Sequence, residues 1–180
     1  TNTTTCLTTG SVTIHNYSKL NLQLSVPGNQ TITYAPDVIN VYGLGPYSTT
    51  NSYTFGSALD FYDFARATDT VILPTDIVLY PVPNSNLAAI GVMIGDDSTS
   101  NSTGFFAAFQ LNGTVSGTGG LEKTGPGILI LNAQNGSGFY NTYADSTRII
   151  RGTLIVNEGS NMGTGPVLMH QITKNNTILK

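Results

Sequence analysis

Apolar and polar residues alternate at every second position along much of this chain, which is the pattern of a half-buried β-strand. The clearest case is residues 20–26, LNLQLSV, where all four aliphatic side chains share one face. Turn-forming Pro, Gly, Asn and Asp residues separate further short runs at 31–34, 38–42, 71–73, 77–80, 89–94 and 105–111. Because helical spacing is nearly absent, we predict an all-β chain with more than ten strands and essentially no helix.

One segment and one boundary are left open by this pattern. Residues 57–66, SALDFYDFAR, fit a helix or a strand about equally well. Glycine becomes frequent and regularly placed after residue 104, which indicates a provisional boundary between 100 and 110. We therefore expect a β-rich N-terminal section, 1–104, made of irregular solenoid coils or a β cap, and a β-solenoid repeat section, 105–180.

The C-terminal section repeats one local pattern, a strand of three to five residues followed by a Gly or Asn corner. Residues 117–131 read GTGGLEKTGPGILIL, with Leu129 and Leu131 facing one way. The same pattern continues through 141–143 (NTY), 147–149 (TRI), 152–156 (GTLIV) and 161–169 (NMGTGPVLM). Strands of this length at this spacing are typical of a β-solenoid, in which each coil stacks its inward aliphatic residues on those of the next coil.

This segment resembles the autotransporter-associated β-strand repeat, also called the passenger-associated transport repeat. The family's pattern Gly-x-Gly-Gly-Leu-x-Lys-x-Gly-x-Gly-x-Leu-x-Leu is met throughout 117–131, and its Asn-Thr-Tyr and Thr-x-Ile-x-x-Gly-Thr-Leu-x-Val parts are met at 141–143 and 147–156. The resemblance covers about residues 109–169. It implies a right-handed parallel β-helix on a secreted or cell-surface protein, and it brings no catalytic residue with it.

Two departures from the family pattern bear on function. Residues 132–140 form a longer insert than usual, which we expect to leave one corner as a loop, and such loops often bind partners. The outward strand positions, usually Thr in the family, are isoleucines, which would form an outer apolar patch. We predict that this patch packs against residues 1–100 or against another chain. The patch residues are Ile128, Ile130, Ile150 and Ile155.

Composition points to an extracellular protein without a nucleic-acid partner. Only 9% of the residues are charged, and seven Lys and Arg against ten Asp and Glu give a net charge of −3. The basic residues are scattered, so no cluster neutralises a run of phosphates. No stretch approaches the roughly 20 apolar residues of a transmembrane helix, so we expect no membrane insertion. Because the chain opens without Met, we expect that a targeting segment has been removed.

Cysteine and asparagine supply candidate modification sites. The single cysteine, Cys6, is either a small buried side chain or half of a disulfide to something outside the chain. Seven Asn-x-Ser/Thr acceptors exceed mildly the number expected from composition, and they are glycosylation candidates if the source is eukaryotic. These acceptors are Asn2, Asn16, Asn29, Asn101, Asn112, Asn135 and Asn175.

Candidate chemistry is sparse. Glycoside cleavage needs two carboxyl groups about 5–10 Å apart, and the candidates are Asp60 with Asp63, Asp96 with Asp97, or Glu122 with either pair. Solvated or corner-capping acids are the simpler interpretation. The run 96–101, DDSTSN, is rich in hard oxygen ligands but lacks the Gly and distal Glu of the common calcium loop, and an Asx turn explains it as well.

Neither a metal site nor a cofactor is predicted. His15 and His170 are isolated, and no P-loop, Gly-x-Ser-x-Gly or Gly-x-Gly-x-x-Gly motif is present. Tyrosines in or beside turns could stack on sugar rings, although tyrosines in a β-protein without Trp more often pack internally. These are Tyr17, Tyr42, Tyr47, Tyr53 and Tyr140.

The favoured function is non-enzymatic: a structural or adhesive module of a secreted or cell-surface protein, with self-association into a filament or docking on a neighbouring domain. Low charge and stackable coils favour assembly. Two alternatives stay open. One is a carbohydrate-active β-helix enzyme, a polysaccharide hydrolase or lyase, which an acid pair in one groove would support. The other is a carbohydrate-binding adhesin tip, which an exposed row of tyrosines would support.

Overall fold

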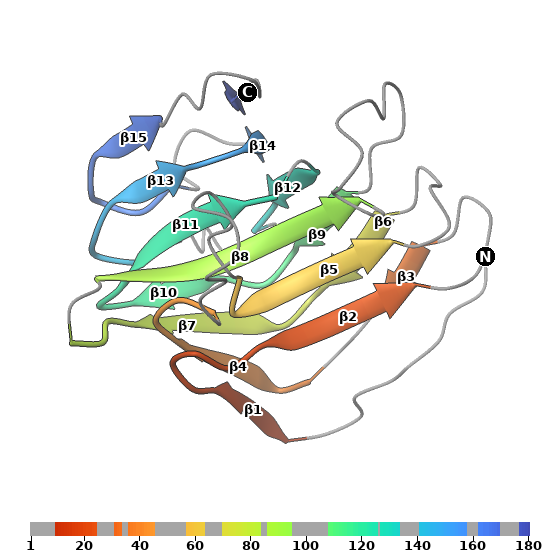
Figure 1. Cartoon of the computed structure of the whole chain (residues 1–180), viewed down its shortest axis with the longest axis horizontal. Helices are drawn as coiled ribbons and strands as arrows, with labels where there is room; N and C mark the ends of the chain where they lie inside the picture. Colours follow the sequence, from red (N-terminus) through yellow and green to blue (C-terminus); the bar gives the residue numbers. More distant parts are fainter. Residues whose placement is uncertain are drawn as a thin grey trace.

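A computed structural model describes residues 10–24, 31–33, 36–45, 57–63, 70–83, 86–94, 108–125, 127–133, 141–157, 162–169 and 177–180. This part of the chain holds sixteen β-strands and no helix (Figure 1). Every strand pair is parallel. The all-β prediction is therefore confirmed, and the ambiguous segment 57–66 contains a strand, β5, rather than a helix.

The strands form three sheets, here named A, B and C. Sheet A has the order β1-β4-β7-β10, sheet B the order β15-β13-β11-β8-β5-β2, and sheet C the order β16-β14-β12-β9-β6-β3. Sheet A consists of β1 (Ser11–Ile14), β4 (Val38–Tyr42), β7 (Asp76–Tyr80) and β10 (Val115–Gly117). Sheet B consists of β2 (Leu20–Leu24), β5 (Leu59–Asp63), β8 (Leu87–Ile94), β11 (Gly120–Thr124), β13 (Thr147–Ile149) and β15 (Val167–Met169). Sheet C consists of β3 (Thr31–Thr33), β6 (Thr70–Leu73), β9 (Ala108–Leu111), β12 (Ile128–Leu131), β14 (Gly152–Val156) and β16 (Thr177–Leu179).

Consecutive strands enter the three sheets in turn. From β1 to β12 the chain visits A, B and C four times, and each strand pairs with the strand one round earlier. After β12 the strands alternate between B and C only. At that stage residues 141–144 continue along β10 through hydrogen bonds from Thr142 N to Val115 O (2.9 Å) and from Ala144 N to Gly117 O (3.0 Å).

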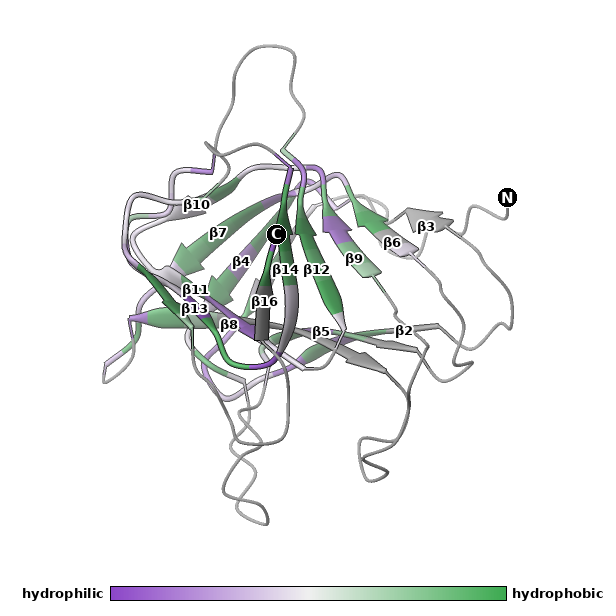
Figure 2. Cartoon of the chain, turned by 90° about the horizontal axis from the view of Figure 1, so that it is seen from above, coloured by the Kyte–Doolittle hydropathy of each residue, from purple (hydrophilic) through white to green (hydrophobic). Residues whose placement is uncertain are grey.

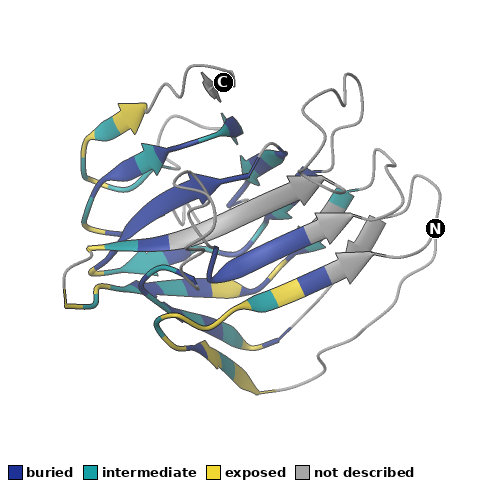
Figure 3. Cartoon of the chain, in the orientation of Figure 1, coloured by how far each residue is buried: buried dark blue, intermediate teal, exposed yellow. Residues whose placement is uncertain are grey.

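One hydrophobic core joins the three sheets. Seen from above, the strands lie on three sides of a common interior (Figure 2). In β4, β7 and β12 the buried positions alternate with less buried ones (Figure 3). In β12 the aliphatic Leu129 and Leu131 are fully buried, while Ile128 and Ile130, which alternate with them, are half-buried on the other face. The alternation in the sequence therefore gives the inward residues of this strand correctly.

All three sheets continue across the boundary proposed near residue 104. The boundary itself falls in 95–107, outside the described residues. On either side of it β7 pairs with β10, β8 with β11, and β6 with β9. The core cluster likewise contains residues from both sections, Phe61 and Phe109 being ring neighbours at 6.2 Å.

The Asn-Thr-Tyr segment has a structural role at the corner before β13. The Oδ1 of Asn141 accepts a hydrogen bond from Val115 N (2.7 Å), and the fully buried Tyr143 shares a 2.5 Å hydrogen bond between its hydroxyl and that of Thr147. Gly163 lies against Tyr143 so closely that a Cβ there would come within 2.3 Å of its carbonyl oxygen. Next to β10, the last strand of sheet A, side-chain and close backbone contacts therefore take the place of a regular strand.

A row of asparagine amides follows the ends of three strands in sheet C. Asn112, Asn132 and Asn157 each come directly after a strand, β9, β12 and β14 respectively. The Nδ2 of Asn132 donates to Oδ1 of Asn112 (2.9 Å), and the Nδ2 of Asn157 donates to Oδ1 of Asn132 (2.5 Å). Because the strands are in register, the same side chain can repeat the same hydrogen bond from one strand to the next.

We predict that Asn132→Ala lowers the free energy of unfolding by about 1–2 kcal/mol, because the central amide makes two of these side-chain hydrogen bonds. Asn157→Ala, at the end of the row, is the matched control and removes only one of them. Urea unfolding followed by circular dichroism measures both. Equal losses in the two variants would show that the second hydrogen bond of Asn132, to Asn112, contributes nothing to stability.

Candidate functional site

Buried charges gather on the outer face of sheet B. In β5 the side chains of Leu59 and Phe61 belong to the core, so Asp60 between them points to the opposite face. Glu122 of β11 likewise lies between the inward Leu121 and Lys123. Both carboxylates are nevertheless fully buried. A buried carboxylate is costly unless a cation or hydrogen bonds compensate it, and each of these has a cation.

Asp60 is paired with Lys19, which precedes β2. The Lys19 Nζ lies 2.5 Å from Oδ2 of Asp60, and the lysine side chain remains 36% exposed. Burial raises the pKa of Asp60 above its ordinary value of 3.8, while Lys19 and, from farther away, Lys123 act in the opposite direction. Burial is the stronger effect, so this carboxyl group holds its proton to a higher pH than an exposed aspartate.

Glu122 is paired with Arg148, its direct neighbour in the register of β11 and β13. The Nε of Arg148 donates to Oε2 of Glu122 at 2.5 Å, and Nη2 contacts the same oxygen. Two residues along β11, the hydroxyls of Thr124 and Ser57 share a buried 2.6 Å hydrogen bond. Polar groups on this face are therefore largely bound to one another.

Lys123 lies on the other, inward face of sheet B, where its side chain is fully buried. Its Nζ donates to the carbonyl oxygens of Thr124 (2.6 Å), Gly125 (2.8 Å) and Arg151 (3.0 Å). These carbonyls belong to the corners that lead from sheet B to sheet C, where Gly125 has a φ of +72° that favours glycine. Burial lowers the pKa of Lys123 from 10.5 to about 7, with Asp60 opposing the shift and Arg151 adding to it.

The two buried carboxylates, Asp60 and Glu122, lie on strands of sheet B that are separated by one strand. Asp60 is in register with Gly91 and, one strand further, with Thr124 rather than Glu122. Two strand spacings and two residue rises put the α-carbons of Asp60 and Glu122 about 12 Å apart. Each carboxylate is also buried and holds a cation, whereas a hydrolytic pair must reach its substrate. Asp63 is the last residue of β5, and its side chain lies outside the described part of the structure. The pair Asp96 and Asp97 lies outside the described residues.

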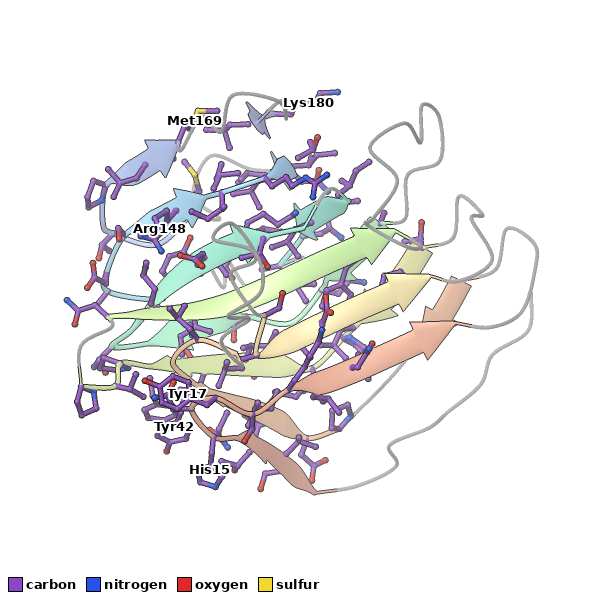
Figure 4. All side chains as sticks on the ribbon, in the orientation of Figure 1. His15, Tyr17, Tyr42, Arg148, Met169 and Lys180 are labelled. Carbon is purple, nitrogen blue, oxygen red and sulfur yellow. The ribbon has the colours of Figure 1, made fainter. Side chains whose placement is uncertain are left out.

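Aromatic side chains form a second cluster where the strands of sheet A end. The rings of His15 and Tyr42 are 5.9 Å apart and inclined by 23°, and those of Tyr42 and Tyr80 are 4.4 Å apart and nearly parallel at 7°. The stack follows the register, in which Tyr42 pairs with Tyr80 and His15 follows the pairing of Ile14 with Val41. Figure 4 shows the labelled Tyr17, Tyr42 and His15 at this corner, at the lower left.

The outer isoleucines are only partly brought together. Ile130 and Ile155 are register partners on the outer face of sheet C, Ile128 is two residues from Ile130, and all three are half-buried. Ile150 is not among them. The short strand β13 ends at Ile149, so the alternation breaks at the corner, and Ile150 is buried there with its N–H bonded to Lys123 O (2.9 Å).

Two glycosylation candidates lie in the described part of the chain, and both are half-buried. The Oδ1 of Asn112 accepts hydrogen bonds from Gln110 (2.8 Å) and Asn132 (2.9 Å). Thr114, the threonine of the same Asn-x-Thr motif, donates a hydrogen bond from its hydroxyl to Asp76 (2.8 Å). Asn16 lies against Gly43, where an added Cβ would come within 2.7 Å of the Asn16 Oδ1. The candidates outside the described residues are Asn2, Asn29, Asn101, Asn135 and Asn175, together with Cys6, Tyr47, Tyr53 and Tyr140.

Sequence reasoning did not find the pairing of Arg148, the inward position of Lys123, or the place of His15 and Tyr80 in the aromatic stack. A usable signal existed for the stack, since His15, Tyr42 and Tyr80 each come at or just after the end of an apolar run. No such signal marked Lys123, which stands in a polar stretch, Glu122-Lys123-Thr124.

Searches for metal sites and for membrane-spanning helices gave no candidate within the described ranges. No three His, Cys, Asp or Glu side chains come together there in a way that would hold a metal ion. Nor does any helix there have the length and apolarity to cross a membrane.

In the comparisons with known proteins, no protein-family profile, no curated protein and no solved structure matches this chain.

Proposed function

We propose that this chain is a non-enzymatic structural or adhesive module of a secreted or cell-surface protein, built as a right-handed parallel β-solenoid. The observation that carries the proposal is the round of A, B and C strands, in which each strand pairs in parallel with the strand one round earlier around one core. Such an arrangement makes a stiff body whose residues contact mainly neighbouring rounds. The similarity of residues 109–169 to the autotransporter-associated repeat supports the same function.

The chemistry of the buried charges also favours a structural function. Lys19, Arg148 and Lys123 each bind groups of the chain itself, a carboxylate in two cases and three carbonyl oxygens in the third. Cations that are bound to groups of the chain itself stabilise the stacked strands rather than act on a substrate.

Self-association is part of the proposal. Three of the four exposed large apolar side chains among the described residues, Leu168, Met169 and Leu179, lie on β15 and β16, the edge strands of sheets B and C. An edge strand presents backbone N–H and C=O groups that can pair with a further strand. We infer that these edges join a second copy into a filament.

Electron microscopy of negatively stained material from the natural source, with light scattering of the purified chain, tests this proposal. Regular fibres, or a mass that rises with concentration, are expected. Met169→Lys should suppress the assembly, and Thr118→Lys, at an exposed position between β10 and β11, serves as the control for the added charge. Discrete monomers at every concentration would remove the filament part, and cleavage of a polysaccharide by the purified chain would overturn the non-enzymatic function.

A further inference from the structure

We propose that the aromatic corner, defined as His15, Tyr17, Tyr42 and Tyr80, is a binding site for a neutral carbohydrate chain. This inference goes beyond the structural function, because it concerns a ligand and holds whether or not the module self-associates. The site lies at the ends of β1, β4 and β7, and Figure 4 shows three of its side chains together at one corner of the molecule.

Tyr17 combines an unfavourable backbone conformation with an exposed ring. Its φ is +62°, the only positive φ of a non-glycine residue in the described ranges, and its side chain is 64% exposed. A left-handed conformation costs a tyrosine about 1 kcal/mol relative to glycine, and an exposed ring gains little of this back by burial. A residue that is unfavourable for the backbone and unused by the core is best explained by what its ring contacts from outside.

The turn that carries Tyr17 is held in a defined place. Tyr17 N donates to Leu44 O (3.0 Å), and Ser18 N donates to His15 O (2.9 Å). On the next round, Gly43 has a φ of +66° and lies so close to Asn16 and Val82 that a Cβ there would come within 2.7 Å of the Asn16 Oδ1 and within 2.6 Å of Val82. The exposed ring is therefore presented by an ordered turn, which lowers the entropy cost of binding.

The neighbouring stack supplies a row of polar aromatic edges. Tyr42 is covered on both faces, by His15 and by Tyr80, so its ring edge rather than its face is left for a ligand. The outer face of His15 and the ring of Tyr17 are in exposed positions and can lie flat on a sugar. Tyrosine combines an apolar face with a hydroxyl group, the two properties that a pyranose ring requires of its partner.

The charges at this corner select a neutral ligand. Tyrosine and asparagine are uncharged, and the nearest lysine in sequence, Lys19, is engaged by Asp60 at 2.5 Å. A phosphate or a uronic acid would therefore meet no free lysine or arginine from this turn, whereas the hydroxyls of a neutral polysaccharide would meet hydroxyl, amide and imidazole groups.

Affinity gel electrophoresis through soluble laminarin, galactomannan or xyloglucan tests the site, with polygalacturonate as the charged comparison. The wild-type chain is expected to be retarded by at least one neutral polymer, and Tyr17→Gly to bind it at least tenfold more weakly. Because glycine suits a φ of +62°, this variant should keep or raise the melting temperature, so lost binding would not reflect lost folding. Tyr17→Asn, which also tolerates this conformation, is the second variant.

Met169→Ala is the matched control, since Met169 is another exposed side chain but lies at the far end of sheet B. It should bind as the wild type does. Absence of retardation by every neutral polymer, equal binding by Tyr17→Gly, or retardation by polygalacturonate alone would each overturn the inference. A monomeric chain that binds a neutral glycan would remove the filament proposal and leave this site standing.

Discussion

Replacement of Lys123 by methionine is expected to abolish a rise in stability with pH that the wild-type chain shows between pH 7 and about 9.5. Methionine has a similar length and no charge, so it fills the same space without donating to the carbonyls of Thr124, Gly125 and Arg151. At pH 9.5 the variant should be less stable than the wild type by about 2–3 kcal/mol, because buried carbonyl groups lose their donor.

The sign of the pH effect follows from the shifted pKa. In the unfolded chain Lys123 binds its proton up to about 10.5, whereas in the folded chain it loses the proton near pH 7. Between these values the unfolded state binds more protons, so stability rises with pH. The rise from pH 7 to pH 9.5 amounts to roughly 3 kcal/mol for a single lysine with this shift.

Two other groups with a shifted pKa, Asp60 and Tyr143, are present in the wild type and in the variant. Burial raises the pKa of Asp60 above 3.8, so its contribution to stability falls as pH rises through the folded-state pKa. Burial also raises the pKa of Tyr143 above 10, which makes its contribution fall at more alkaline pH. Both groups remain in the variant, so the difference between wild type and Lys123→Met reports the lysine together with its interaction with Asp60.

Lys180→Met is the matched control, because Lys180 is exposed and the same change of side chain removes no buried donor. Urea unfolding at pH 6, 7, 8 and 9.5 gives the stability of all three proteins. Lys180→Met should follow the wild-type slope. Parallel slopes for wild type and Lys123→Met would show that Lys123 keeps its proton in the folded chain.

Strand positions were predictable from the sequence because burial in this fold depends on neighbours along one strand. Alternation alone gives the inward positions of Leu22 in β2 and of Leu129 and Leu131 in β12. Ile150 departs from this rule, since it follows a three-residue strand and turns inward at the corner. Corners are set by backbone conformation and by contacts with the next round, neither of which a two-residue period contains.

The candidate sites were harder to predict because they depend on register between distant strands. The stack of Tyr42 on Tyr80 requires the pairing of β4 with β7, and the contact of Glu122 with Arg148 requires that of β11 with β13. The buried position of Lys123 was the hardest of these features to predict. A lysine between a glutamate and a threonine suggests a solvated strand end, and only the carbonyl groups of two successive corners explain why it is buried.

Loss of Arg148 is expected to cost about 3–5 kcal/mol of stability, because Arg148→Met leaves a fully buried Glu122 without its closest cation. Glu122→Gln should cost less, since a neutral amide is cheaper to bury than a carboxylate. The double variant Glu122→Gln, Arg148→Met should recover part of the loss caused by Arg148→Met alone. The resulting coupling energy between the two sites should be about 1–3 kcal/mol.

This cycle also separates the structural interpretation of the buried carboxylates from a catalytic one. If Glu122 has a structural role between the stacked strands, the double variant recovers stability. Polysaccharide binding at the aromatic corner, which lies on another sheet, then stays unchanged in all three variants. Urea unfolding supplies the free energies and affinity electrophoresis the binding. Additive losses in the cycle would contradict the pairing, and a cleavage activity that disappears in Glu122→Gln at wild-type stability would assign that carboxylate to catalysis.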